Sequence, residues 1–369
     1  MEDSLSQSLH ANAAEWYRVR KGNPSESIEY IHHLHMSGDT EGLAEALSEE
    51  GHSLVKAGHI ELLGILRVLE ASLFGPRTRF VIHELTGDIL SIQGRWDEAE
   101  EQYDHALPIA VKHKLMTPLA RIYSSRADLA VKKGEMDNAL SLHKKALEMQ
   151  IKLRDAQGAA RSYNNMGYIF RRQRDNKRAI EVYGNVEELL ESEDSSDLTE
   201  ARIRLASAFL EMGELDRARD HAMKAHDETA ENNQEKLHAR SRAVLGRYYA
   251  RIKDNDLAMH HYTGALEILS DQSDPRSAVE VEILLGQVLS DAGSTEEAAQ
   301  HYLDALSIAE ANDFRMMQGE ILSRLGEVES NRSQRMDYLQ RSLVVFRELG
   351  AVDRMREVQN SVHRVVMGH

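Results

Sequence analysis

The chain has 369 residues, and its formal net charge is −16, with 45 Lys and Arg against 61 Asp and Glu. This balance disfavours binding of the chain as a whole to nucleic acid or to an anionic membrane, although it leaves a local basic face possible. The absence of cysteine excludes disulfides, thiolate metal sites and a cysteine nucleophile. Only 5 prolines and 5% aromatic residues favour helices over sheets.

The N-terminal sequence MEDSLSQSLHANAAEW lacks the basic patch and apolar core of a signal peptide. The chain also contains no apolar run of about 18 residues, the length that a membrane-spanning helix needs. We therefore expect a cytoplasmic protein without a membrane segment.

Residues 1–78 are predicted to form a linker of degenerate helical repeats, because glycines divide them into short helical stretches. The dividing positions are Gly22, Gly38, Gly58 and Gly75-Pro76. Trp16 and Tyr17 are expected in the core of this segment. His32, His33 and His35 are interpreted as surface and packing residues, because no Asp or Glu lies at ligand spacing in the same turn.

A period of 40 residues follows, and a small residue marks the same position in each unit. The separations between these anchors are 40, 40, 39, 40, 40 and 40 residues. The anchors are Gly87, Ala127, Gly167, Ala206, Gly246, Gly286 and Gly326. An irregular helical bundle would not keep such a register through the chain.

Other positions recur with the anchors and predict a helical hairpin in each unit. A turn follows each anchor at Gly94, Gly134, Arg174, Gly213, Lys253 and Gly293. An alanine follows the turn at Ala99, Ala139, Ala179, Ala218, Ala258 and Ala298. Four residues later comes Tyr103, His143, Tyr183, Ala222, Tyr262 or Tyr302, and three later Ala106, Ala146, Val186, Ala225, Ala265 or Ala305. Residues at this spacing share one helix face, so stacked hairpins can bury it.

This pattern of small residue, glycine turn, alanine, aromatic residue and alanine resembles the tetratricopeptide repeat (TPR), whose usual period is about 34 residues. The longer repeats look like those of kinesin light chains, polarity scaffolds and bacterial signalling regulators. The resemblance implies an all-α fold, a right-handed TPR-like α-solenoid. We expect the array to span 79–348, with six clear repeats and one degenerate repeat.

The last repeat departs from the pattern, which predicts a capping end. Glu329-Ser330-Asn331-Arg332-Ser333 replaces the glycine turn, so the second helix is expected to begin about three residues early. Residues 349–369 are predicted to form a C-terminal capping helix. Its apolar side is expected to carry Val352, Met355, Val358, Val362 and Val365.

The N-terminal segment resembles the helices that follow the winged helix in STAND-class signalling ATPases, including the maltotriose-responsive activator type. The matching residues are His10, Ala13-Ala14, Trp16-Tyr17, Ile28, His32, Leu34, Gly38-Asp39, Ala44, Gly51 and Gly58. This resemblance implies the ligand-sensing half of such a regulator. No G-x-x-x-x-G-K-[ST] motif occurs, so nucleotide binding by that route is not expected. A fragment of a longer regulator and a free-standing descendant both fit the sequence.

In a TPR array the first helix of each pair lines the concave groove, which implies where a ligand would bind. With the anchor as position 8, about positions 2, 5, 9, 12 and 13 face the groove. The central units carry mainly cations and amides there. The candidate groove residues are Arg121, Lys132, Arg161, Asn164, its neighbour Asn165, Tyr168, Arg171, Arg172, Arg240, Arg247 and Arg251. The outer units carry acids instead, at Glu84, Asp88, Glu280, Asp291, Glu320 and Glu327.

We interpret the central groove as a site for a protein or acidic peptide, or for a small anionic ligand, because the guanidinium fork of arginine suits carboxylate and phosphate. An alternative is that these arginines form salt bridges between repeats with Glu200 and Glu211. No catalytic motif, metal site or cofactor site is predicted. A sensor module and a free-standing scaffold or adaptor that docks partner proteins both remain open, and so does the oligomeric state.

Overall fold

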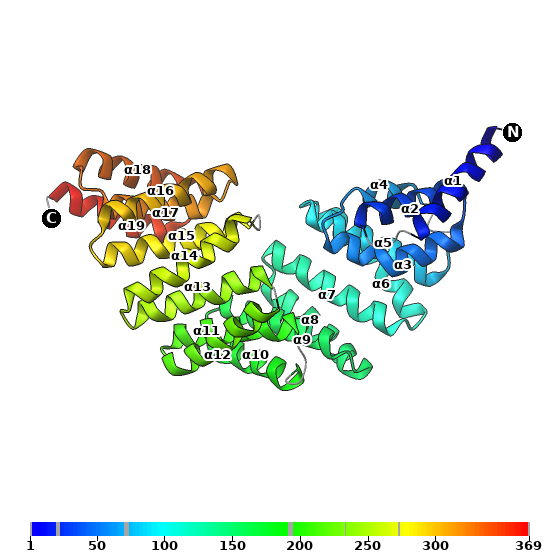
Figure 1. Ribbon diagram of the computed structural model, residues 1–369, viewed down its shortest axis with the longest axis horizontal. Coiled ribbons are helices and arrows are strands. Elements are labelled where there is room, and N and C mark those ends of the chain that lie inside the picture. Colours follow the sequence, from blue (N-terminus) through cyan, green and yellow to red (C-terminus); the bar gives the residue numbers. More distant parts are fainter. Residues whose placement is uncertain are drawn as a thin grey trace. The chain divides into compact units, whose positions relative to one another are not determined.

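The computed structural model describes residues 2–19, 23–69, 74–190, 195–232, 234–271 and 274–367. Within these ranges the chain forms nineteen helices and no strand (Figure 1). The predicted all-α class is therefore confirmed. None of the helices in these ranges combines the length and the apolar character needed to cross a membrane. The helices fall into two compact units, Met1–Ile169 (unit 1) and Phe170–His369 (unit 2).

Unit 1 contains four shorter or irregular helices followed by the first regular hairpins. In sequence order its helices are α1 (Glu2–Arg18), α2 (Pro24–Ser37), α3 (Thr40–Lys56), α4 (Leu62–Val68), α5 (Pro76–Ile92), α6 (Trp96–Lys112), α7 (Met116–Lys133), α8 (Met136–Leu153) and most of α9 (Ala156–Arg172). Helices α5 and α6 pack as one hairpin and α7 and α8 as the next, as the repeat predicts.

Unit 2 continues the pattern to the end of the chain. Its helices are α10 (Asn176–Leu190), α11 (Ser196–Met212), α12 (Leu215–Glu231), α13 (Glu235–Arg251), α14 (Asn255–Asp271), α15 (Pro275–Asp291), α16 (Thr295–Ala311), α17 (Arg315–Val328), α18 (Arg332–Glu348) and α19 (Val352–Met367). Figure 1 shows the hairpins α11–α12, α13–α14, α15–α16 and α17–α18 stacked one after another.

The turn inside each hairpin has left-handed backbone, as the sequence predicts. Gly134 has φ of 83°, and it adopts this conformation without a steric clash because glycine has no Cβ. Arg174 and Lys253, which replace glycine in two repeats, still have φ of 61° and 63°. The hairpin geometry therefore overrides the preference of these two residues.

The recurring alanines and aromatic residues form the core between helices. The alanines of both recurring positions, and Val186, have no exposed surface. Tyr103, Tyr183, Tyr262 and Tyr302 are also inaccessible to solvent, to within 1%. This agrees with the face assignment made from the spacing, and it places the apolar contribution to stability between stacked hairpins.

The identity of the anchor is coupled to the ring that packs on it. A Cβ added at Gly246 would lie 2.5 Å from Cε1 of Tyr262, and one at Gly286 would lie 2.6 Å from Cε1 of Tyr302. Glycine is therefore needed wherever the tyrosine ring lies flat against the anchor. The two alanine anchors instead face the smaller side chains His143 and Ala222, sixteen residues further along the chain.

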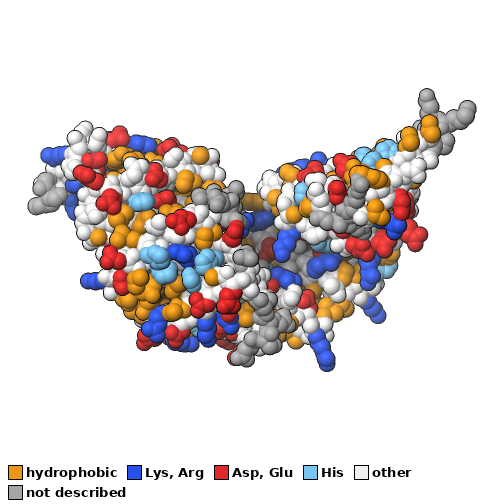
Figure 2. Space-filling view, viewed as in Figure 1, with side chains coloured by type: hydrophobic (Ala, Val, Ile, Leu, Met, Phe, Trp, Pro, Cys, Tyr) orange, Lys and Arg blue, Asp and Glu red, His pale blue; other side chains and the backbone are white. Residues whose placement is uncertain are grey.

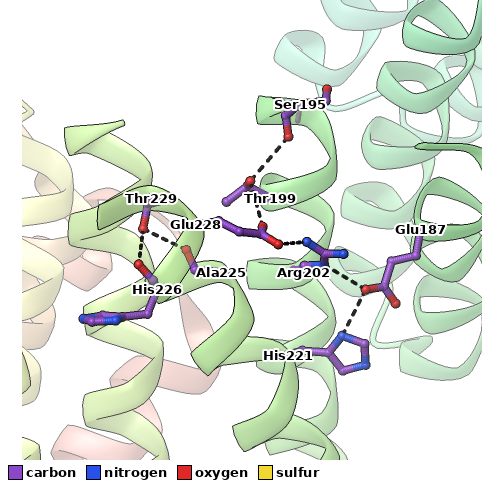
Figure 3. A network of polar contacts seen from close by, with 9 residues as sticks. All are labelled: Glu187, Ser195, Thr199, Arg202, His221, Ala225, His226, Glu228 and Thr229. Atoms are coloured by element: carbon purple, nitrogen blue, oxygen red, sulfur yellow. Dashed lines mark hydrogen bonds and ion pairs between the residues drawn. The ribbon is translucent and has the colours of Figure 1, made fainter. Parts of the chain in front are cut away.

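Polar contacts link neighbouring hairpins on the side of α11 shown in Figure 3. The Arg202 guanidinium donates a hydrogen bond from Nε to Glu187 on α10 at 3.1 Å, and it also pairs with Glu228 on α12. His221 lies 3.4 Å from the same Glu187 carboxylate. Burial acts to raise the pKa of Glu187, but His221 and Arg202 together hold it below its usual range. This network fixes α11 between its neighbours.

The chain ends agree with the predicted departures, with two exceptions. Helix α18 begins at Arg332, six residues after its anchor, whereas α16 begins nine residues after Gly286. The early start is therefore confirmed. Val358 and Val365 of α19 are buried as expected, but Val352 is 62% exposed.

At the N-terminal end, Trp16 is 49% exposed, so the expectation of a core position was wrong for this residue. Helix α1 packs on α2 through other residues.

Candidate functional site

A cavity of about 650 Å³ in unit 2 lies along the first helices of successive hairpins. Its walls come from α11, α13, α15 and α17, with a contribution from the last turn of α9. Five arginines line it, and we call it the arginine cavity. They are Arg171, Arg240, Arg247, Arg276 and Arg324. Three of these, Arg171, Arg240 and Arg247, are among the predicted groove residues.

Arg240 shares a carboxylate with a second arginine. Its guanidinium binds Glu200 through both terminal nitrogens, with Nη2 2.9 Å from Oε1. Arg204, one turn after Glu200 on α11, donates to the same carboxylate from Nε. Burial acts to raise the pKa of Glu200, but the two arginines hold it below its usual range. This Arg204–Glu200–Arg240 triad carries one more positive than negative charge.

A second triad lies around Glu211 at the end of α11. Arg171 donates to the Glu211 carboxylate, and Arg247 reaches the same Oε1 only at 4.0 Å. Burial lowers the pKa of Arg247, which the Glu211 carboxylate partly opposes and Arg171 reinforces. The Arg171–Glu211–Arg247 triad therefore also carries one surplus positive charge, and Arg247 is its less compensated member.

The far wall of the cavity, on α15 and α17, is balanced in charge. Arg276 lies 3.6 Å from Glu280, and Arg324 donates to Glu320 at 3.1 Å. Arg324 also donates to Gln287. Glu280 and Glu320 line the cavity, so its positive surplus is confined to the α9–α13 side.

Apolar side chains also line the cavity, and we call them the apolar floor. They include Val244 of α13, Leu284 of α15, and Met316 and Met317 of α17. Val244 is buried, whereas Met316 is 48% exposed. Unbranched methionine side chains adapt to irregular apolar ligands. The cavity thus combines hydrogen-bond donors on one wall with an apolar surface, the usual composition of a ligand pocket.

The predicted groove residues of unit 1 form a different site. Arg121 donates two hydrogen bonds to the buried Glu84 at 3.0 and 2.7 Å, and His52 lies 2.7 Å from the same carboxylate. Lys132 donates to Ser91 Oγ at 2.8 Å. Arg121 and Lys132 therefore link α7 to α5, and the partner of Arg121 is Glu84, which the salt-bridge alternative did not name.

A smaller cavity of about 300 Å³ in unit 1 contains two carboxylates, and we call it the aspartate cavity. Tyr103 donates to Asp88 at 2.7 Å, and Asn165 donates to Asp128 at 3.1 Å. Burial raises the pKa of each aspartate to about 6, and their mutual repulsion adds to the shift in Asp128. Lys132 lines the same cavity and partly opposes the shift.

The other predicted residues are divided between the two units. In unit 1, Asn164 is buried, and Arg161 and Tyr168 are exposed on α9. In unit 2, Arg172 and Arg251 are exposed and do not line the arginine cavity. The structure thus brings together only the three cavity arginines among the predicted set in unit 2.

Arg204, Arg276 and Arg324 were not among the residues predicted from the sequence. Arg204 and Arg324 each follow a groove-facing glutamate, Glu200 or Glu320, by four residues, so they share its helix face. Counting that position as groove-facing would have found both. Arg276 lies at the start of α15, where the repeat pattern carries no signal.

Histidines gather over α13 and α14 in Figure 2, outside the arginine cavity. The rings of His226 and His238 lie 4.8 Å apart, and Tyr249 stacks on His261 at 5.2 Å. Burial lowers the pKa of His261 to about 4. Across the described ranges, no group of three or more histidines or carboxylates is arranged to hold a metal ion. We interpret this cluster as packing between rings.

Comparison with known families and structures places the fold. The model of the MalT-like TPR region matches residues 75–318, about two thirds of the chain. No curated protein sequence matches the chain.

Solved structures resemble the chain at low sequence identity. A STAND protein with a tetratricopeptide repeat sensor from Pyrococcus horikoshii has 13% identity and a TM-score of 0.70, covering 96% of this chain and 55% of that one. The Rap conjugation gene regulator of plasmid pLS20, in complex with the Phr* peptide, has 14% identity and a TM-score of 0.56, covering 84% and 94%. BtubC from P. vanneervenii has 23% identity and a TM-score of 0.51, covering 60% and 92%. These likenesses show the TPR-type α-solenoid fold, and the chain spans about half the length of the STAND protein.

Proposed function

The chain belongs to the MalT-like TPR family, and on that premise we propose that it is a non-catalytic module that binds a peptide or a small anionic ligand in the arginine cavity. The observation that carries this proposal is the pair of Arg–Glu–Arg triads beside an apolar floor. In a chain of net charge −16, two triads with surplus positive charge on one wall favour an anionic group there.

The salt-bridge alternative and the binding proposal are compatible in these triads. One carboxylate cannot satisfy two guanidinium groups, each of which has five N–H donors. The pairs between repeats therefore position the arginines and leave donors for a ligand. The cavity volume of about 650 Å³ lies within the range typical of small-ligand sites.

We further propose that the module is the sensor part of a STAND-type regulator. The support is the family match together with a fold shared over 96% of the chain with a STAND protein that has a TPR sensor. The Rap regulator, which is of the same fold, is seen with a bound peptide, and this favours a peptide among the ligand classes.

The binding proposal is tested by equilibrium dialysis of the purified chain against a defined pool of short peptides, small carboxylates and small phosphates, read by mass spectrometry. The variant Arg171→Gln/Arg247→Gln should lose roughly tenfold or more in affinity, because hydrogen bonds to charged groups contribute about 1.5–3 kcal/mol each. In the double variant the Glu211 carboxylate has lost both of its arginine partners. If that variant folds poorly, adding Glu211→Gln removes the unpaired charge, and the triple variant is tested instead.

The matched control is Arg121→Gln/Lys132→Gln, which removes two groove cations from unit 1 and should leave binding unchanged. A loss that follows the control variant would move the site to the aspartate cavity. Retention of no member of the pool by any form would contradict the proposal.

The alternative function is a free-standing scaffold or adaptor that docks partner proteins. A sensor must couple ligand binding to a change elsewhere in the chain, whereas a scaffold need not. Hydrogen exchange with bound ligand distinguishes them. Protection that extends beyond α11, α13, α15 and α17 favours the sensor, and protection confined to these helices favours the scaffold.

A further inference from the structure

The ligand class of the arginine cavity can be narrowed from the way its cations are already used. Arg240 binds Glu200 through both terminal nitrogens, and Arg324 donates to Glu320 and Gln287. Within the described part of the chain no hydrogen bond is made by Arg247 or Arg276, and Arg276 is the more exposed of the two, with 67% of its side chain accessible. The one ion partner of Arg247, Glu211, lies at 4.0 Å and is already paired with Arg171.

Arg247 is also two thirds buried, with 33% of its side chain exposed. A buried guanidinium with unused donors is costly, and burial lowers its pKa accordingly. A carboxylate can accept two parallel hydrogen bonds from such a group, and this geometry suits arginine better than lysine. Arg247 is therefore the partly buried cavity arginine whose N–H groups are least used within the chain.

The surface next to Arg247 is apolar. Ala243 and Val244 precede it by one helical turn on α13 and line the same cavity, and Leu284 and Met317 extend the lining onto α15 and α17. An anionic group bound at Arg247 thus has room for an aliphatic or aromatic body directly beside it.

The far wall, on α15 and α17, favours a ligand with a single anionic group, the one bound at Arg247. Glu280 and Glu320 on α15 and α17 pair with Arg276 and Arg324, so this wall offers no surplus positive charge to a second anion. The same carboxylates can accept hydrogen bonds from amide N–H groups or from an ammonium. A polyphosphate or a run of acidic side chains therefore fits this cavity poorly.

We propose that the arginine cavity binds the carboxyl-terminal end of a short peptide whose last residue is apolar, with its carboxylate held by Arg247. The last side chain packs on the floor around Val244, Leu284 and Met317, and the preceding backbone lies toward Glu280 and Glu320. This inference rests on the proposed function of the cavity and adds the polarity and chemistry of the ligand.

The test uses the full chain and synthetic pentapeptide pools with four randomised positions and a fixed last residue, either Leu, Phe, Asp or Lys. Each pool is prepared as the free acid and as the C-terminal amide, and retained peptides are counted by mass spectrometry after size exclusion. We expect the Leu and Phe acids to be retained roughly tenfold more than their amides, the loss expected for one charged hydrogen-bond pair.

The decisive variant is Arg247→Gln, with Arg251→Gln as its matched control. Arg251 lies one turn further along α13, is exposed, and does not line the cavity. Arg247→Gln should abolish the preference for acids over amides, and Arg251→Gln should keep it. Circular dichroism of both variants checks that helicity is unchanged.

The outcomes separate this inference from the proposed function. Equal retention of acids and amides, or an acid preference that survives Arg247→Gln, overturns the inference while peptide binding stands. Preference for the Asp pool in its amide form would assign Arg247 to a side-chain carboxylate and would also overturn it. No retention from any pool would contradict the peptide ligand itself.

Discussion

One repeat of unit 2 carries a positive charge at the position where two repeats of unit 1 carry a negative charge. The residue directly after the anchor is Asp88 and Asp128 in two repeats of unit 1, and Arg247 in a repeat of unit 2. In unit 1 both carboxylates have raised pKa values. Burial is the main cause, and repulsion from Glu84 adds to the shift at Asp88 and repulsion from Asp88 to the shift at Asp128. In unit 2 the groove carboxylate Glu200 has a lowered pKa, because two arginines outweigh its burial.

The positions behind the groove do not differ in this way. The alanine after each turn has no exposed surface in either unit, and the tyrosine rings Tyr103 and Tyr262 are equally buried. Stacking therefore constrains one face of each hairpin, and the groove face is free to vary in charge. The following substitutions test whether the packing face and the groove face of the hairpins are independent of each other.

The largest effect on stability is expected at the glycine–tyrosine packing that both units contain. Gly87→Ala and Gly246→Ala each place a Cβ against the ring of Tyr103 or Tyr262, so both should destabilise the chain by roughly 1–3 kcal/mol. Thermal denaturation followed by circular dichroism measures this, and the two losses should be similar because the packing is the same in both units.

A double-mutant cycle supplies the control for this prediction. In a Tyr262→Ala background, Gly246→Ala should cost nothing further, because the chain already contains such a pair at Ala206 and Ala222. An equal loss in both backgrounds would show that the glycine is needed for its backbone and not for the ring.

The next effect concerns His143, which occupies the tyrosine position in unit 1. Burial lowers its pKa to about 4, below the ordinary value of about 6.5. Its contribution to stability is therefore present above pH 6.5 and is lost as the pH falls toward 4. Between pH 7 and pH 5 this loss is about 2 kcal/mol.

The variant Ala127→Gly/His143→Tyr converts this repeat to the glycine–tyrosine pair of unit 2 and should remove that acid sensitivity. Urea denaturation at pH 7 and pH 5 checks it. His143→Tyr alone should destabilise at both pH values, because the Ala127 Cβ occupies the space of the ring. An unchanged pH dependence in the double variant would assign the sensitivity to another group. His261 is one such group, because burial lowers its pKa to about 4 as well.

Much of the fold could be predicted from the sequence, because stacking imposes a strict period. The spacing of the anchors predicted the hairpins and the turns at Arg174 and Lys253, and the altered turn sequence at 329–333 predicted the early start of α18. Trp16 and Val352 were misassigned because they lie at irregular ends, where an apolar residue has no repeat partner to fix its side.

The site was less predictable, because it depends on which side chains meet. The period shows that Arg240 and Glu200 are 40 residues apart and so adjacent in the stack, but it does not show how many arginines share one carboxylate. Nor does it show that Arg247 is left at 4.0 Å from Glu211. These are properties of rotamers and burial, and they require coordinates.

A smaller effect distinguishes the groove carboxylates of the two units directly. Glu200→Gln leaves Arg204 and Arg240 without their shared counter-charge, and should destabilise the chain by about 1–1.5 kcal/mol at pH 7. Chemical denaturation provides the measurement. A gain in stability would mean that burying the Glu200 carboxylate costs more free energy than its attraction to Arg204 and Arg240 provides.

The smallest effect should have the opposite sign. Asp88 has a pKa raised to about 6 by burial, so its contribution to stability is fully present below about pH 3.9 and is lost as the pH rises through 6. Asp88→Asn removes the charge while its side-chain oxygen can still accept the hydrogen bond from Tyr103. It should therefore stabilise the chain by on the order of 1 kcal/mol at pH 7.5 and have little effect at pH 4.5. Destabilisation at pH 7.5 would show that a cation compensates Asp88 in solution, and that the two grooves differ less in electrostatics than their sequences indicate.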